Sequence, residues 1–301
     1  MDGGVMRFVT LENDHLGAVV SGRVVDLAAA ASKLGRARPI GTLLELIEAG
    51  DAMTRSVWEL AEYAARRGVA VKPFEDARPK APIPRPRRNI VCLGKNYRAH
   101  AREVAATALG GDGLPVRPIF FTKATTAVIG PGDPIPSHRQ LTGQLDYEGE
   151  VAVIIGRGGR NIQRESAMEH VFGYTIINDV SARDLQAGHV QWFFGKSLDG
   201  FAPMGPVVVH RSIMPSPEKI ELRCSVNGEL RQRGNLGQLI FGIPAIIETL
   251  SAGMALLPGD IIATGTPSGV GAGYDPPRFL AVGDTVTVEV TGAGTLRNTV
   301  V

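Results

Sequence analysis

Three acidic residues alternate within the stretch LDYEGEVAV at residues 145–153. Asp146, Glu148 and Glu150 would share one face of a strand, because alternate residues of a strand point to the same side of its sheet. Neighbouring like charges are unfavourable unless a cation neutralises them. The Cα atoms of Glu148 and Glu150 would lie about 6.5 Å apart, so both side chains can reach one ion. The alternative is a solvated strand face, which the apolar continuation VAVIIG makes less favourable.

The ligand atoms indicate which ion would bind. Neither a cysteine nor a pair of histidines lies close to these acids in the sequence, and hard oxygen ligands favour Mg²⁺, Mn²⁺ or Ca²⁺ over zinc or copper. Asp179 is a candidate third ligand, because it ends the apolar stretch GYTIIND just before an expected helix. An ordinary cap or turn aspartate is the alternative for Asp179 taken alone.

Two further motifs contain residues suited to proton transfer and to charge stabilisation. His100 and Glu103 lie three positions apart in GKNYRAHARE, so on a helix they would be neighbours. A carboxylate that orients an imidazole makes a general base able to activate water. Lys196 follows a glycine in FFGKSLDG, where a partly desolvated ammonium could stabilise a developing anion. The alternative for His100 and Glu103 is an incidental surface pair. The alternative for Lys196 is an ordinary surface lysine.

Two segments that contain glycines resemble known phosphate-binding patterns but do not match them. Val190 stands where the phosphate-binding loop before a Gly-Lys pair needs glycine, so that match fails. The loop ATGTPSGVGAG (263–273) does not fit the dinucleotide pattern either. It offers backbone N–H groups and the hydroxyls of Thr264 and Thr266 to an anion, or it is simply a flexible turn.

The elements that must position these residues can be outlined from apolar spacing and from glycine and proline. The sequence predicts short strands over 5–27, a helix over 41–66, a strand at 89–97, a short helix over 98–106, strands near 118–123, 145–156 and 172–179, a helix over 243–253 and a strand over 284–290. Ser181 and Asp184 have the spacing of a helix cap, which predicts a short helix over SARDLQ.

The proline-rich segment EDARPKAPIPRPRR (75–88) divides the chain, because proline at this density continues neither a helix nor a central strand. We therefore predict a small N-terminal α/β domain over 1–78, a linker over 79–88 and a main domain over 89–301. The 37 glycines and 20 prolines among 301 residues favour many turns and a sheet-rich α+β fold.

Composition excludes several classes of protein. The hydrophobic content of 44% and the charged content of 21% are ordinary for a globular protein, and the net charge of +2 gives no sign of nucleic-acid or membrane binding. No apolar run approaches the roughly 18–20 residues of a membrane helix, and the N-terminus lacks the features of a signal peptide. Cys92 and Cys224 lie in apolar, strand-like contexts, which fits unpaired thiols and a cytoplasmic location.

Taken together and in order, seven segments resemble the fumarylacetoacetate hydrolase family, in particular its bacterial branch of acylpyruvate hydrolases and 2-hydroxyhepta-2,4-diene-1,7-dioate isomerases. The segments are GKNYRAHARE, PIFFTKATTAVIGPGDPI, LDYEGEVAVIIG, GYTIINDVSARDLQ, FFGKSLDGFAPMGP, LLPGDIIATGTPSGVG and VGDTVTVEVTGAGTLRN. The resemblance covers about 89–301, and the small N-terminal domain also suits the bacterial branch.

The resemblance implies a mixed β-sandwich roll, a homodimer and a divalent metal, usually Mg²⁺. It implies that the metal ligands are Glu148, Glu150 and Asp179. It also implies that His100 and Glu103 form a water-activating pair on a mobile lid, and that Lys196 lies beside the keto group of the substrate. Among the departures from the family pattern, the glycine-rich segment 104–117 is expected to form a long lid. The residues implied to bind the carboxylate and oxygens of the substrate are Lys123, Arg183, Gln186 and Thr266.

The function predicted from these residues is hydrolysis of a carbon–carbon bond in a β-diketo acid of the acylpyruvate or fumarylpyruvate type. Oxaloacetate decarboxylation and isomerisation of a 2-hydroxy-diene dioate use the same enolate and remain alternatives, with the His100–Glu103 pair favouring hydrolysis. A keto-acid binding protein without catalysis is the alternative of another class. Asp146 has no implied ligand role, and we expect it to make a structural hydrogen bond or ion pair near the site.

Overall fold

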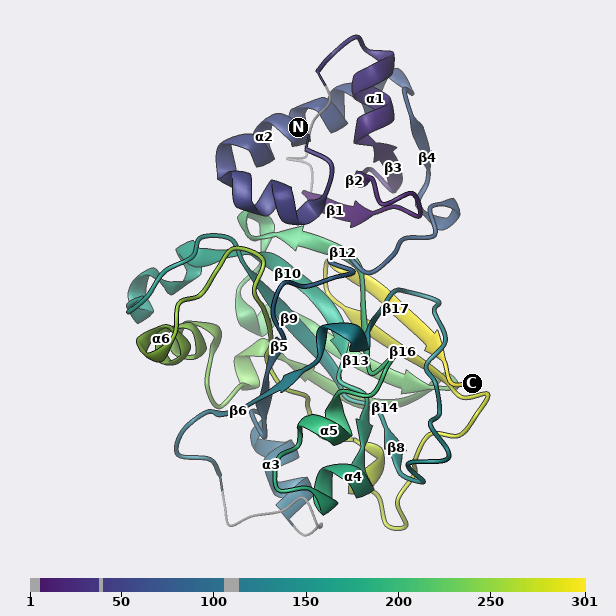
Figure 1. The fold of residues 1–301 in the computed structure, drawn as a ribbon, viewed down its shortest axis with the longest axis vertical. Coiled ribbons are helices and arrows are strands. Elements are labelled where there is room, and N and C mark those ends of the chain that lie inside the picture. Colours follow the sequence, from purple (N-terminus) through teal and green to yellow (C-terminus); the bar gives the residue numbers. More distant parts are fainter. Residues whose placement is uncertain (1–5, 38–39, 106–113) are drawn as a thin grey trace.

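The computed structural model describes residues 6–37, 40–105 and 114–301. Within these ranges the largest sheet has the strand order β4-β3-β2-β1-β12-β10-β9-β15-β5-β6, and β7 pairs with β12 beside this path (Figure 1). Its strands are β1 (Arg7–Thr10), β2 (Leu16–Val20), β3 (Arg23–Asp26), β4 (Val71–Pro73), β5 (Ile90–Gly94), β6 (Ile119–Lys123), β7 (Val128–Ile129), β9 (Gly149–Ile155), β10 (Val171–Asn178), β12 (Ala202–His210) and β15 (Ile261–Ala263).

A second sheet packs against the first. It has the order β14-β13-β16-β17, from β13 (Glu221–Val226), β14 (Glu229–Asn235), β16 (Thr285–Val290) and β17 (Gly294–Thr299). A side chain at Gly149 of β9 would lie 3.1 Å from both Cys224 of β13 and Val288 of β16, so the two sheets are in close contact there. All residues of β9, β10 and β12 are buried, which explains their near-continuous apolar runs. The α+β, sheet-rich sandwich predicted from the sequence is confirmed.

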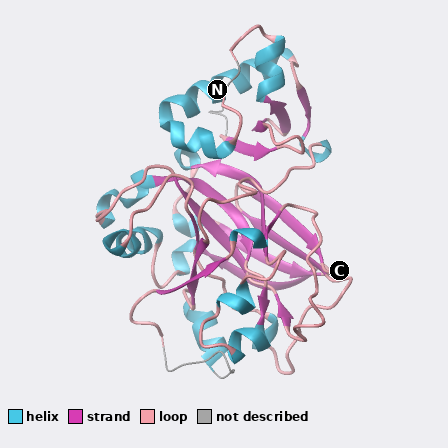
Figure 2. Cartoon of the chain, viewed as in Figure 1, coloured by secondary structure: helices cyan, strands magenta, loops and turns pink. Residues whose placement is uncertain are grey.

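Six α-helices surround the sheets in the described ranges (Figure 2). They are α1 (Leu27–Lys33), α2 (Leu43–Arg67), α3 (Arg98–Ala105), α4 (Arg183–Gly188), α5 (Phe193–Lys196) and α6 (Ile243–Gly253). Short 3₁₀ turns are η1 (Phe74–Asp76), η2 (Thr125–Ala127), η3 (Arg164–His170), η4 (Arg211–Ile213), η5 (Pro217–Lys219), η6 (Leu236–Gln238) and η7 (Gly271–Gly273). Helix α2 begins at a capping box of Thr42 and Glu45 and ends at Gly68 in the left-handed conformation.

The N-terminal part, β1 to β4 with α1 and α2, continues the main sheet (Figure 1). Strand β1 pairs antiparallel with β12, with Arg7 opposite Val209 and Phe8 opposite Val208. Residues 78–89 contain neither helix nor strand, as their prolines predict, and the carbonyl of Pro82 accepts a hydrogen bond from the Thr10 hydroxyl at 2.7 Å. The division at 1–78, 79–88 and 89–301 stays a prediction.

The single strand expected near 145–156 is wrong, because two strands occupy this segment. Leu145 and Asp146 form β8, which pairs with β11 (Ser181–Ala182), and β9 begins only at Gly149. Between them the Asp146 carboxylate accepts a hydrogen bond from the Tyr147 N–H at 2.9 Å, while the Tyr147 hydroxyl donates to the Gly269 carbonyl at 2.9 Å. These two contacts turn the chain between the strands.

The helix cap expected at Ser181 is also wrong. Ser181 lies in β11, its hydroxyl donates to the Asp179 carbonyl, and α4 begins two residues later without a side-chain cap. Asp184 accepts instead from the Thr142 hydroxyl at 2.5 Å and from the Gly143 N–H at 2.9 Å. Of the expected lid over 104–117, residues 106–113 lie outside the described residues. Among the described helices, none combines the length and the apolar character needed to cross a membrane.

Candidate active site

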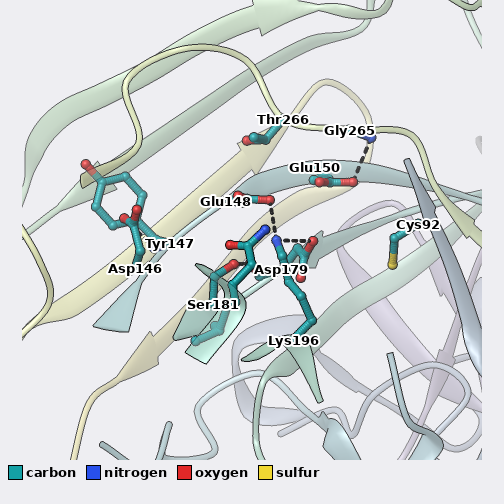
Figure 3. A network of polar contacts seen from close by, with 12 residues as sticks. Cys92, Asp146, Tyr147, Glu148, Glu150, Asp179, Ser181, Lys196, Gly265 and Thr266 are labelled. Carbon is teal, nitrogen blue, oxygen red and sulfur yellow. Dashed lines mark hydrogen bonds and ion pairs between the residues drawn. The ribbon is translucent and has the colours of Figure 1, made fainter. Parts of the chain in front are cut away.

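Two antiparallel strands bring three carboxylates together. Glu148 immediately precedes β9, Glu150 lies within it, and Asp179 follows β10. Asn178 is opposite Gly149 in this pair of strands, and the Asp179 N–H donates to the Glu148 carbonyl at 2.8 Å. One carboxylate oxygen from each acid lies within 4.8 Å of the others, and all three residues are buried (Figure 3). The structure therefore brings the three predicted metal ligands to one point.

Lys196 lies between two of these carboxylates, Glu148 and Asp179. Its Nζ donates to Glu148 Oε2 at 2.9 Å and to Asp179 Oδ2 at 2.8 Å (Figure 3). Burial opposes the charge of Lys196, but Asp179 and Glu148 outweigh it and raise the pKa of the ammonium. Burial likewise opposes the charge of Glu148, but Lys196 and Arg183 outweigh it and hold the pKa of that carboxyl below its ordinary value. Both groups are therefore charged at neutral pH.

Lys123 lies behind the carboxylates. It is fully buried, and its Nζ donates to Asp179 Oδ1 at 2.5 Å, to the Val180 carbonyl at 3.0 Å and to the Lys196 carbonyl. An ammonium has three donors, so all of them are used. The resemblance implied that Lys123 contacts the substrate, but the residue does not line the cavity described below. Its contacts hold Asp179 and the end of α5 in place.

Glu150 differs from the other acids because it has no cationic partner. Its Oε2 accepts from the Gly265 N–H at 2.7 Å, and its buried Oε1 has no partner among the described residues. Burial, followed by repulsion from Asp179 and Glu148, raises the pKa of Glu150 well above its ordinary value. An unpaired buried oxygen beside two other carboxylates fits a hard divalent cation, which would supply the missing positive charge.

Helix α3 presents an oriented imidazole. His100 Nδ1 lies 3.1 Å from Glu103 Oε2, and Glu103 Oε1 accepts from the Gly269 N–H at 2.8 Å. A carboxylate only accepts hydrogen bonds, so Nδ1 carries the proton and Nε2 is left as the basic nitrogen. His100 is buried and lines the cavity. The predicted helix, pair and orientation are all present.

Asp146 has the structural role expected from the sequence. Its Oδ2 accepts from Arg183 Nε at 2.8 Å and from the Ala272 N–H at 3.0 Å, while its Oδ1 accepts from the Gly271 N–H at 2.7 Å. Figure 3 shows its side chain directed away from Glu150. Asp146 thus anchors the glycine-rich loop and the arginine beside the metal ligands.

The remaining predicted binding residues differ in whether their polar atoms already have hydrogen-bond partners within the protein. Arg183 Nη1 donates to Glu148 Oε1 at 2.7 Å and to Gln186 Oε1 at 3.0 Å, whereas its buried Nη2 has no partner among the described residues. The Thr266 hydroxyl donates to the Gly149 carbonyl and accepts from Gln232 Nε2. Arg183 therefore has a donor available for an anion, while the Thr266 hydroxyl is already engaged.

One small cavity collects these groups. Its volume of about 20 Å³ accommodates roughly one water molecule. The predicted residues that line it are His100, Glu148, Arg183, Gln186, Lys196 and Thr266. Val104, which begins the expected lid, also lines it, and sequence reasoning missed Leu93, Gly94, Lys95, Phe121 and Trp192. The apolar members look like ordinary core residues in a sequence, and only Lys95, in the quoted motif GKNYRAHARE, carried a signal that could have found it.

The comparisons with known proteins agree with this geometry. Residues 89–301 match the family described as fumarylacetoacetate (FAA) hydrolase, C-terminal. Oxaloacetate tautomerase YisK of Bacillus subtilis (strain 168) is 49% identical over 281 residues, which cover 92% of each chain. The solved structure of a fumarylacetoacetate hydrolase from psychrophilic Exiguobacterium antarcticum is 41% identical, with a TM-score of 0.82 and coverage of 98% of this chain and 99% of that one.

A third similar protein was solved with bound groups. Maleylpyruvate hydrolase from Sphingobium sp. SYK-6, in complex with manganese(II) ion and pyruvate, is 30% identical, with a TM-score of 0.76 and coverage of 98% of this chain and 99% of that one. The resemblance seen in the sequence is thus confirmed by the profile match, by close relatives and by the fold. The chain belongs to the fumarylacetoacetate hydrolase family.

Proposed function

We propose that this protein is a divalent-metal enzyme that interconverts the keto and enol forms of a 2-keto acid through an enolate. The observation that carries the proposal is the set of side chains that line one cavity or lie directly beside its lining residues. They combine three carboxylates that include the unpaired Glu150 oxygen, a charged Lys196 and the oriented imidazole of His100. The 49% identity to a protein named oxaloacetate tautomerase supports this reaction over the others that use an enolate.

The metal would be held by Glu148, Glu150 and Asp179. Mg²⁺ is the proposed ion, since three carboxylates are hard ligands, and Mn²⁺ would suit the same oxygens. When bound, such an ion acts as a Lewis acid toward the oxygens of a 2-keto acid. It would also supply the positive charge that Glu150 lacks.

The side chains of this protein would carry out the proton transfer. His100 Nε2 removes a proton from the carbon next to the keto group, and Glu103 stabilises the imidazolium that forms. The ammonium of Lys196 stabilises the negative charge that develops on the enolate oxygen. The free Nη2 of Arg183 is available for the carboxylate of the substrate. Return of the proton to oxygen or to carbon completes the interconversion.

Hydrolysis of an acylpyruvate is the second candidate, and the His100–Glu103 pair favours it. In that reaction His100 takes its proton from water, the hydroxide attacks the distal carbonyl, and the carbon–carbon bond breaks to give a carboxylic acid and a pyruvate enolate. Oxaloacetate decarboxylation and diene-dioate isomerisation pass through the same kind of enolate. A keto-acid binding protein would keep the ligand contacts without any of these reactions.

A substrate panel separates these possibilities. Oxaloacetate, an acylpyruvate and a 2-hydroxy-diene dioate would be incubated with the purified protein, with and without Mg²⁺, and the enol absorbance and the products would be followed. We expect Mg²⁺-dependent loss of the oxaloacetate enol. Fragments of the acylpyruvate as the main product would favour hydrolysis instead. Binding without turnover of any substrate would favour the binding protein.

Replacement of the base tests the mechanism. We expect His100→Ala to lower kcat about 10²–10⁴-fold, the usual contribution of a general acid–base group. The exposed His189 is the control, and His189→Ala should leave kcat unchanged. Unchanged turnover in His100→Ala would contradict the assigned role of the imidazole.

A further inference from the structure

Among the residues that the structure describes, three lysine or arginine side chains line the cavity, and one of these three has no anionic partner. Lys196 pairs with Glu148 and Asp179, and Arg183 pairs with Asp146 and Glu148.

Lys95, the third cation, is half-buried. It makes no hydrogen bond or ion pair with the residues that the structure describes. Burial lowers the pKa of Lys95, because the ammonium loses water without gaining a counter-charge. An anion bound in the cavity would supply the missing counter-charge.

The backbone holds Lys95 in a conformation that few residues adopt. It follows β5 with φ +54°, in the left-handed region, which residues with a side chain rarely adopt. The next residue, Asn96, fixes the segment, because its side chain donates to the Phe241 and Thr264 carbonyls and accepts from the Phe241 N–H. The position of Lys95 is therefore imposed by the fold.

The sheet places Lys95 at a distance from the metal ligands. Strand β15 lies between β5 and β9, and adjacent strands are about 4.8 Å apart, so the backbones of β5 and β9 are separated by roughly 10 Å. Glu148, just before β9, and Lys95, just after β5, line the same cavity, so a ligand whose keto-acid end lies at Glu148 can present its other end to Lys95. Phe121 and Trp192 add apolar surface to the same cavity.

We propose that Lys95 binds a second carboxylate at the far end of the substrate, and so makes the enzyme selective for dicarboxylic 2-keto acids over keto acids with a neutral tail. The inference rests on the proposed function, because it takes the keto-acid end to lie at the metal ligands. It assigns the selection to a residue that takes no part in the proton transfer.

The kinetic test compares Lys95→Met with the unchanged protein, both saturated with Mg²⁺. We expect kcat/KM for oxaloacetate to fall about 10–100-fold, the usual value of a charged hydrogen bond, and mainly through KM. For acetylpyruvate, which has a neutral tail, the change should stay below about threefold. Arg98→Met is the matched control, because Arg98 is an exposed cation on the adjacent helix α3 and should affect neither substrate. Equal losses for both substrates, or no loss for either, would overturn the proposal.

A binding measurement separates failure of this inference from failure of the proposed function. Calorimetric titrations with 2-oxoglutarate and with pyruvate, again with Mg²⁺ present, compare a diacid and a monoacid without any turnover. We expect the unchanged protein to bind the diacid more tightly and Lys95→Met to lose that preference, even if no substrate is turned over. A preference that persists in Lys95→Met, or equal binding of the two acids by the unchanged protein, would show that Lys95 does not select.

Discussion

Glu150 is a buried carboxylate whose hydrogen-bond partner is a neutral backbone N–H. Each of the other three buried carboxylates of the site has a lysine or arginine within hydrogen-bond distance. Among the described residues, an ionised Glu150 is therefore a buried negative charge that no lysine or arginine contacts. This imbalance costs stability in the protein without a metal and makes binding of a divalent cation favourable.

The first prediction concerns Glu150→Gln, which keeps the shape and removes the charge. We expect Mg²⁺ affinity to fall by at least about 100-fold, because loss of a ligand should exceed the usual loss from a group that only supports one. In the presence of EDTA the same variant should unfold at a higher temperature than the unchanged protein. Calorimetric titration and thermal unfolding measure the two effects. Unchanged Mg²⁺ affinity would exclude Glu150 as a ligand.

A second prediction is that stabilisation by Mg²⁺ grows with pH. A carboxyl whose pKa is raised on folding keeps its proton where the unfolded chain has lost it, so the free energy of unfolding falls as pH rises. For Glu150 this window begins near the ordinary glutamate pKa of about 4.3 and ends at the raised value in the folded protein. Mg²⁺ competes with that proton.

The measurement is the unfolding temperature with EDTA and with Mg²⁺ across this window. The difference between the two curves should widen toward alkaline pH, and Glu150→Gln should make it small and independent of pH. A difference that narrows as pH rises would contradict the assignment.

At the scale of the elements, the sequence predicts what depends on local patterning. Helix α6 runs over 243–253 as expected, because proline near its start and glycine at its end mark both boundaries. Helix α3 forms, as predicted, over the segment that contains His100 and Glu103. The meeting of Glu148 and Glu150 could be predicted because their spacing is local in the sequence, whereas Asp179 was reached through the family motifs.

The features that the sequence does not reveal depend on partners far along the chain. The break between β8 and β9 is imposed by contacts of Asp146 and Tyr147 with the loop at 269–272. The substrate-binding role of Lys123 is implied only by the family resemblance, and a buried lysine and a substrate-binding lysine look alike in a sequence. Only the structure shows that its donors are all used by Asp179, Val180 and Lys196.

The third prediction concerns the loop that holds Glu103. Gly269 has φ +105°, and an added Cβ would lie 1.9 Å from the Arg231 carbonyl oxygen. We expect Gly269→Ala to lower the free energy of unfolding by about 2–4 kcal/mol, and to lower kcat because Glu103 loses the N–H that orients it.

Gly283→Ala is the matched control for this loop. Gly283 has φ +95° but open space around it, so its substitution should cost only about 1 kcal/mol and leave kcat unchanged. Chemical denaturation and steady-state kinetics measure both. Equal effects of the two substitutions would mean that backbone strain alone accounts for them.

At the scale of the whole molecule, one sheet joins the N-terminal part to the part that carries the site. The sheet passes from β4 through β1 to β12 and on to β9, which carries Glu150. The homodimer implied by the family resemblance stays a prediction, and sedimentation velocity would test it.

The pairing of β1 with β12 limits how far this protein can be divided into modules. The family profile covers 89–301, but a chain cut at residue 89 would leave the backbone of Val208 and Val209 without its neighbour strand. An unprotected strand edge of this kind recruits other chains.

We therefore expect residues 89–301 expressed alone to aggregate, and addition of a 1–88 fragment to restore a monodisperse species, as measured by light scattering. A monodisperse and active 89–301 chain would contradict this. If residues 89–301 do aggregate alone, the two segments would have to change together in evolution, since the first supplies the strand β1 that pairs with β12 of the second.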